Sequence, residues 1–319
     1  MTAKYDQDLE KCPANHVALT PLNLLTRSVA VYPDKTAVIY GDRTYDYKTF
    51  YDRCCRLASA LKKRGIGSGD TVAIMSPNLP AVLEAHFGVP MCGGVLNTLN
   101  IRLDAESIAF QLTHGEAAIV LVDLQFSRLV HDAVDGMDTT PLIVDVEDPQ
   151  AEIEDAVTGD LTYEALLAEG DPDEPWSLPD DEWGAITLNY TSGTTGNPKG
   201  VVFHHRGAYL EALGNIIALE LQPTSVYLWT LPMFHCNGWT YTWAVTAVGG
   251  THICLRNVEP AQVFEAIDTQ GVTHMCGAPI VLNMLIHAAD SVKRPLPHQV
   301  KVATGGAAPP SAVLRNTAD

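Results

Sequence analysis

Two periodicities of apolar residues alternate along the chain. Short runs rich in Val, Ile, Leu and Thr indicate strands, whereas apolar residues three or four positions apart indicate helices. The strand-like segments are 36–40, 43–47, 71–75, 118–122, 142–146, 185–190, 226–231, 251–255 and 272–276. The helix-like segments are 50–61, 80–88, 104–114, the stretch after Gln125, 208–219, 240–248 and 261–270. Strands that alternate with helices predict an α/β fold built on parallel sheets.

The acidic residues suggest how the chain is divided. They are concentrated between Asp145 and Glu182, and such a charge run is usually a solvated surface connection. We therefore expect a first α/β region over about residues 1–182 that ends in this acidic connection. A second α/β region is expected over about residues 183–319, and no internal sequence repeat is visible.

Composition and charge exclude several classes of function. The net charge of −18 argues against nucleic acid or an anionic membrane as the main partner. No run of about 18 apolar residues is present, so no membrane span is expected. The polar N-terminus lacks the apolar core of a signal peptide, and the seven cysteines show no metal-binding spacing. These features predict a cytoplasmic protein with reduced thiols.

The strongest chemical signal is the segment Tyr190–Gly200, which reads YTSGTTGNPKG. Its three glycines let the backbone approach a ligand closely, and its hydroxyls and successive N–H groups suit phosphate oxygens. Lys199 adds a positive charge. The segment is not a Walker loop, because Lys199 lies three residues beyond Gly196 and no Ser or Thr follows it. A strand runs directly into this phosphate-binding candidate.

The segment closely resembles the signature loop of the adenylate-forming superfamily, which includes acyl-CoA synthetases, luciferases and the adenylation domains of peptide synthetases. The resemblance implies a loop that holds the β- and γ-phosphates of ATP, with Thr191 helping to bind magnesium and Thr191 and Lys199 acting in catalysis. The implied phosphate-binding residues are Thr191, Ser192, Gly193, Thr194, Thr195, Gly196 and Lys199. Donors aimed at the phosphates would stabilise the charge of the leaving pyrophosphate.

Two further segments resemble the family in the expected order. In the segment 231–239, LPMFHCNGW, the family likeness implies that His235 is catalytic beside the substrate carboxylate and that Trp239 gates the acyl channel. It implies an acyl pocket formed by Phe234, His235, Asn237, Gly238 and Trp239, with Cys236 near the nucleotide. The segment 303–309 resembles the adenine-binding turn, formed by Gly305, Gly306, Ala307, Ala308 and Pro309.

The resemblance covers nearly the whole chain and implies a fold and an activity. The fold is the large N-terminal domain of adenylate-forming enzymes, with two α/β sheet subdomains and the beginning of a β-rich subdomain. The implied reaction joins a carboxylic acid to coenzyme A through an acyl-adenylate, using ATP and Mg2+. The most similar branch comprises bacterial short- and medium-chain acyl-CoA ligases, including those that act on the methylthio-substituted acid 3-methylmercaptopropionate. A homodimer is also expected.

Several family elements have no counterpart in the sequence. They are the magnesium-sharing glutamate, the ribose-binding aspartate, the hinge, and the small C-terminal domain with its catalytic lysine. The final segment 309–315 has the pattern of a helix start that ends after about two turns, so we expect the chain to be truncated and inactive alone. Two alternatives stay open: an adenylation domain that loads a carrier protein, and a non-catalytic nucleotide-binding module.

Overall fold

The structure, a computed structural model, describes residues 4–5, 7–151, 153, 156–191 and 197–308 and contains two β-sheets. The seven-stranded sheet has the order β7 (Leu161–Thr162), β6 (Leu142–Val146), β5 (Ala117–Asp123), β3 (Thr71–Met75), β4 (Val95–Thr98), β8 (Ala185–Tyr190), β9 (Gly200–His204). The six-stranded sheet has the order β13 (Lys301–Thr304), β12 (His274–Gly277), β10 (Val226–Leu228), β11 (Thr251–Ile253), β1 (Thr36–Tyr40), β2 (Arg43–Asp46). All pairings are parallel except β1–β2 and β8–β9.

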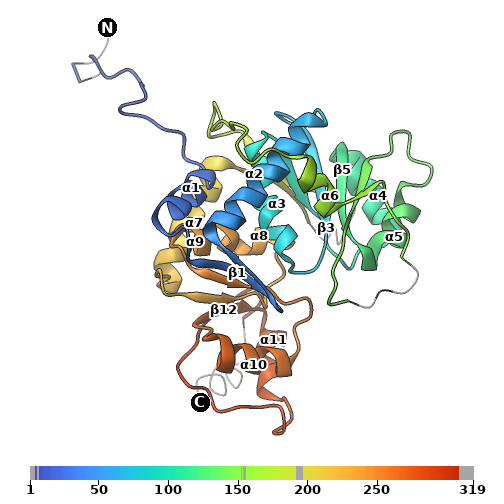
Figure 1. Ribbon diagram of the computed structural model, residues 1–319, viewed down its shortest axis with the longest axis vertical. Helices are drawn as coiled ribbons and strands as arrows, with labels where there is room; N and C mark the ends of the chain where they lie inside the picture. The colour runs from blue at the N-terminus through green and yellow to red at the C-terminus, as the bar shows by residue number, and fades with distance from the viewer. Residues whose placement is uncertain (1–3, 6, 152, 154–155, 192–196, 309–319) are drawn as a thin grey trace.

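Helices cover both faces of the sheets and fill the space between them (Figure 1). They are α1 (Leu22–Val31), α2 (Tyr47–Lys63), α3 (Pro80–Met91), α4 (Ala105–His114), α5 (Ser127–Val134), α6 (Tyr163–Glu169), α7 (His205–Leu219), α8 (Cys236–Trp239), α9 (Tyr241–Ala247), α10 (Pro260–Gln270), α11 (Pro279–Ile286) and the 3-10 helix η1 (Leu124–Phe126). The predicted α/β fold with parallel sheets is confirmed.

Side-chain alternation along β3 shows how the layers form. Val72 and Ile74 pack with α2 and α3, whereas Ala73 and Met75 pack with α4 and α5 on the opposite face. A strand covered on both faces must be apolar throughout, which explains the uninterrupted run TVAIM. The six-stranded sheet is covered in the same way by α10 and α11 on its outer face. The resulting layers are helix, sheet, helix, sheet and helix.

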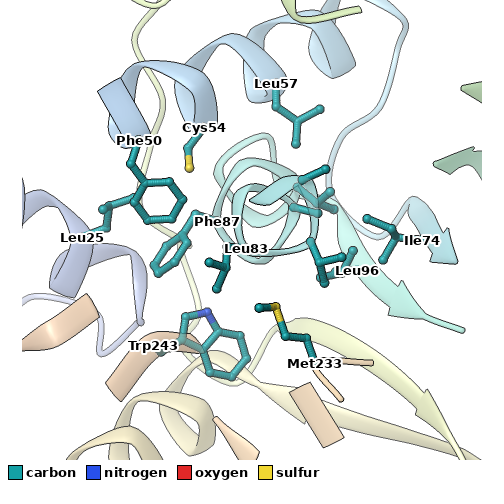
Figure 2. Close-up of a cluster of buried hydrophobic side chains, with 14 of the residues drawn as sticks. Leu25, Phe50, Cys54, Leu57, Ile74, Leu83, Phe87, Leu96, Met233 and Trp243 are labelled. Carbon is teal, nitrogen blue, oxygen red and sulfur yellow. The ribbon is translucent and has the colours of Figure 1, made fainter. Parts of the chain in front are cut away.

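Helix α3 is the centre of the molecule. Every one of its residues is buried, as expected for a helix that is apolar around its whole circumference. Figure 2 shows Leu83 and Phe87 of this helix between Phe50 of α2 and Trp243 of α9. The rings of Phe50 and Phe87 meet edge to face with their centroids 5.7 Å apart. One continuous core therefore joins the two sheets.

The two sheets do not follow the expected division at residues 182 and 183. Strands β1 and β2, from the first region, complete the sheet formed by β10 to β13, and β8 and β9, from the second region, complete the sheet formed by β3 to β7. The chain thus crosses between the sheets twice. Pairing with distant strands decides sheet membership, and such pairing leaves no local signal in the sequence.

Most predicted elements form, and some differ in extent. Asp104, the first residue of the predicted segment 104–114, caps α4 by accepting a hydrogen bond from the Ser107 N–H at 2.9 Å. The strand predicted over 226–231 ends at Leu228, because the Asn78 amide binds the backbone carbonyls of Trp229 (2.9 Å) and Leu231 (3.0 Å) in place of a neighbouring strand. Helices α1, α6, α8 and α11 and strands β4, β7 and β9 were not predicted.

A buried ion cluster connects the carboxyl ends of strands from both sheets. Arg256, which follows β11, binds both oxygens of Asp123 at the end of β5, at 2.7 and 2.8 Å, and Asp148 at 2.8 Å. The side chains of the two aspartates are 0% and 1% exposed, and that of Arg256 is 11% exposed. The Tyr40 hydroxyl of β1 also donates to Asp148. One guanidinium therefore pairs with two buried carboxylates.

Replacing Arg256 with Met should destabilise the protein by about 3–5 kcal/mol, because it leaves two buried carboxylates without a cation. Urea unfolding followed by circular dichroism measures this difference. The matched control is Arg294→Met, which breaks the ion pair with Asp268 between side chains that are 43% and 42% exposed. That change should cost less than about 1 kcal/mol. Equal effects of the two substitutions would contradict a special role for the buried cluster.

Candidate nucleotide and acyl site

The predicted phosphate loop connects β8 to β9 in an antiparallel hairpin. Tyr190 pairs with Gly200, the Thr191 N–H donates to the Lys199 carbonyl at 3.0 Å, and the Lys199 N–H donates to the Thr191 hydroxyl oxygen at 3.1 Å. These bonds hold the two ends of the loop together. The residues Ser192, Gly193, Thr194, Thr195 and Gly196 lie outside the described part of the chain.

Thr191 and Lys199 are both exposed at the base of this loop. Within the described residues, Lys199 takes part in no ion pair, so its ammonium group is available to an anion. The strand β9, which the sequence did not reveal, begins directly after the loop. A phosphate bound by the loop would therefore lie at the N-terminal end of β9, and residues farther along this strand line a pocket.

That pocket has a volume of about 400 Å³ and three walls. The first wall is β9, the second is the N-terminal half of α7, and the third is the segment that follows His235. The lining residues are Val202, Phe203, His204, Gly207, Ala208, Glu211, Cys236, Trp239 and Thr240. Most of the lining is apolar, which suits a hydrocarbon chain. Of these residues, the sequence suggested only Cys236 and Trp239 for the site.

The segment Cys236–Thr240 forms a left-handed turn. Its φ angles are +48°, +56°, +59°, +51° and +62° in chain order. Left-handed backbone costs about 1–2 kcal/mol for most residues other than glycine and asparagine, and three of the five residues here are of that kind. Strain of this kind persists where the surrounding structure holds it, and it gathers at functional sites.

The turn separates the predicted acyl-pocket residues into two groups. Trp239 lines the pocket, as does Cys236, which was predicted near the nucleotide. The half-buried Phe234 and the exposed His235 are not among the lining residues. Asn237 and Gly238 are buried behind the pocket wall. A Cβ atom on Gly238 would lie 2.5 Å from the Trp229 ring, so a side chain has no room there. The thiol of Cys236 has its pKa raised by burial.

The predicted adenine-binding turn lies against Trp239. It follows β13, with Gly306 at φ +82° and both Ala307 and Ala308 exposed, while Pro309 lies outside the described residues. The Trp239 ring fills the space in which a Gly305 side chain would stand, since a Cβ atom there would be 2.6 Å from the ring. The structure thus joins two motifs that are far apart in sequence.

Among the described residues, no group of three or more His, Cys, Asp or Glu side chains could hold a metal ion by itself. A Mg2+ ion bound mainly through substrate phosphates needs few protein ligands, and the exposed Thr191 hydroxyl fits that requirement. None of the described helices is long and apolar enough to cross a membrane.

Comparison with known proteins places these features in a family. A family model described as AMP-binding enzyme matches residues 25–319. The chain is 50% identical to a peroxisomal acetate/butyrate–CoA ligase of Arabidopsis thaliana, covering 96% of this chain and 56% of that protein. It is 42% identical to a peroxisomal trans-cinnamate:CoA ligase of Petunia hybrida, covering 96% and 56% of the two chains. The chain spans about half the length of these curated relatives.

Solved structures show the same fold. The N-terminal domain of FACL13 from Mycobacterium tuberculosis matches with a TM-score of 0.82 at 24% identity, covering 94% of this chain and 73% of that one. The expected fold, that of the N-terminal domain of adenylate-forming enzymes, is confirmed. Because the family model covers almost the whole chain, this chain belongs to the family of AMP-binding enzymes.

Proposed function

We propose that this chain activates a carboxylic acid as part of an ATP-dependent acyl-CoA synthetase. The reaction joins the acid to AMP with release of pyrophosphate, and coenzyme A then displaces AMP to form the thioester. One observation carries the proposal: the strand that leaves the phosphate loop also forms a wall of the apolar pocket, and Trp239 of that pocket lies against the adenine-turn residue Gly305. The relatives named as CoA ligases support it.

The residues can be given distinct roles in adenylation. Lys199 and the loop N–H groups bind the β- and γ-phosphates and stabilise the charge that develops on the leaving pyrophosphate. Thr191 is the residue of this chain that would bind Mg2+, which when bound neutralises phosphate charge. His235, at the entrance of the left-handed turn, can donate a hydrogen bond to the carboxylate or the α-phosphate during attack. A large indole such as that of Trp239 can exclude water from the mixed anhydride.

Exchange of radiolabelled pyrophosphate into ATP by the full-length protein tests this proposal. Exchange that requires a carboxylic acid supports adenylation. Release of phosphate without exchange would indicate a nucleotide hydrolase, and ATP binding without either reaction would indicate a non-catalytic module. Offering coenzyme A and a carrier protein as alternative acceptors separates the synthetase from an adenylation domain that loads a carrier.

The acid that we propose is of short to medium chain length, including methylthio-substituted acids. The pocket is apolar and open, and relatives are named as ligases of acetate, butyrate, 2-methylpropanoate, trans-cinnamate and benzoate. Exchange rates over a panel of these acids decide the preference. A cytoplasmic location stays a prediction, which cell fractionation tests, and several relatives are named peroxisomal. A homodimer also stays a prediction, which light scattering tests.

Replacing Trp239 with Ala should raise the KM for the acid by about tenfold, since the indole forms part of the pocket wall. The KM for ATP should change little. The control is Trp176→Ala, which removes a partly buried indole that is bonded to Tyr51 at 3.0 Å and lies outside the pocket lining. A rise in the KM for ATP with an unchanged KM for the acid would contradict the gate assignment.

A further inference from the structure

The left-handed turn Cys236–Thr240 needs an external cause, because besides one glycine and one asparagine, which tolerate this backbone, it contains three residues that disfavour it. We propose that His86, Asn237 and Asn215 are positioning residues that hold this turn from two sides and thereby place His235 and Trp239. The inference rests on the proposed acid-activating function. None of the three residues lines the pocket, so each acts through the turn.

His86, Asn237 and Asn215 together form a clamp on the turn. The first side of this clamp is a buried hydrogen-bond network around Asn237. This side chain is completely buried, and its Oδ1 accepts bonds from the Asn189 amide at 2.8 Å and the Thr187 hydroxyl at 2.9 Å, both on β8. Its Nδ2 lies 3.2 Å from Nε2 of His86 on α3. Asn237 therefore ties the turn to the strand that leads into the phosphate loop and to the central helix.

The state of His86 follows from its two contacts. Its Nδ1 lies 2.7 Å from the Val82 carbonyl, which can only accept, so Nδ1 carries the proton. Nε2 is then an acceptor for the Asn237 amide. The imidazole is fully buried, and burial lowers its pKa to about 4, so it stays neutral at ordinary assay pH. Nε2 of His86 is thus an uncharged acceptor that faces the Asn237 amide.

The second side of the clamp is Asn215 on α7. Its Nδ2 donates to the Trp239 carbonyl at 2.6 Å and lies 2.8 Å from the Thr240 hydroxyl oxygen. The turn is therefore bonded at its second residue to α3 and β8, and at its last two residues to α7. His235 immediately precedes the turn, and the Trp239 ring contacts Gly305. A shift of the turn would move both the carboxylate-site histidine and the pocket wall.

Two substitutions of His86 separate positioning from simple stability. In His86→Gln, the amide reaches the position of Nε2 and can still accept from Asn237, but the bond to Val82 is lost. In His86→Asn, the shorter amide reaches only the position of Nδ1, so the bond to Asn237 is lost. Both variants are uncharged and lose one buried hydrogen bond, so they should lose similar melting temperature. Only the Asn variant should release the turn.

Alkylation of Cys236 by iodoacetamide, followed by peptide mass spectrometry, reports on the turn without any catalysis. Cys236 is partly buried, Cys12 is an exposed internal reference, and the other five cysteines are buried. Release of the turn exposes the Cys236 thiol and lowers its raised pKa, so His86→Asn should accelerate alkylation about tenfold. His86→Gln should match the wild type. Equal rates in the two variants would overturn the proposal.

Kinetics of the full-length protein complete the test. His86→Asn should raise the KM for the acid about tenfold and lower kcat, whereas its KM for ATP should not change. The kinetic constants of His86→Gln should match those of the wild type. Ser28→Ala, which removes a buried hydrogen bond of 2.6 Å to the Thr246 carbonyl, away from the turn, controls for lost stability.

If neither His86 variant folds, Asn215→Ala, at a half-buried position, should also accelerate Cys236 alkylation, and an unchanged rate would overturn the proposal. Absence of acid-dependent exchange in the wild type would refute the proposed function, while the alkylation comparison would still decide the role of the clamp.

Discussion

Lys199→Ala should reduce acid-dependent pyrophosphate exchange by about 10²–10³ in kcat, the usual loss when one group that stabilises developing charge is removed, about 2.7–4 kcal/mol. Lys199 is exposed at the base of the loop and lies outside the hydrophobic clusters, so its loss should change the free energy of unfolding by less than about 0.5 kcal/mol. Single-turnover kinetics and urea unfolding of the same preparation measure the two effects.

The matched control is Lys48→Ala, which removes another exposed lysine, in the first turn of α2. It should leave both measurements unchanged. Thr191→Ser supplies a second comparison, because it keeps the oxygen that accepts the Lys199 N–H and should retain more activity than Thr191→Ala. If Lys199→Ala loses stability in proportion to activity, the loop is structural and its assignment to the phosphates is wrong.

Acidification should destabilise the protein well before its carboxylates are protonated. Burial lowers the pKa values of His86 and His205 to about 4 and that of His252 to about 3. Each ring is nearly or completely buried and hydrogen-bonded in its neutral form. In the unfolded chain a histidine binds a proton near pH 6.5, so protons favour the unfolded state below that pH.

The expected loss is about 1.4 kcal/mol per histidine for each pH unit between about 6.5 and 5, or roughly 4 kcal/mol per unit for the three together. Urea unfolding at pH 7, 6 and 5 measures the slope. His252→Gln removes one of the three titrating groups and should reduce the slope by about a third, whatever its effect at pH 7. A free energy of unfolding that stays constant from pH 7 to pH 5 would contradict the prediction.

Local sequence was sufficient for the helices and strands whose signals are local. The alternating run of β1 and β2 around Gly41-Asp42, and the Asp104 cap three residues before Ser107, each record an interaction between near neighbours. The candidate phosphate loop could be proposed because its chemistry depends on residue types at short fixed spacings, with the two residues that close it, Thr191 and Lys199, only eight positions apart. Order along the chain then linked this loop to the histidine and adenine motifs.

The pocket could not be predicted in the same way. Its walls come from β9 and α7 as well as from the turn after His235, and an apolar residue on an edge strand has the same local pattern whether it lines a cavity or faces solvent. Asn237 shows the limit most clearly. Its neighbourhood suggested contact with the substrate, whereas the fold buries it against His86, Thr187 and Asn189.

The α/β class and the order of the motifs can be read from the sequence alone, because periodicity and short-range spacing encode these features directly. Tertiary packing sets which sheet each strand joins, makes Cys236–Thr240 left-handed, and brings the Trp239 ring into the space beside Gly305. These features depend on contacts between residues that are distant along the chain. Their free energies arise only when helices and sheets pack together, so no local pattern records them.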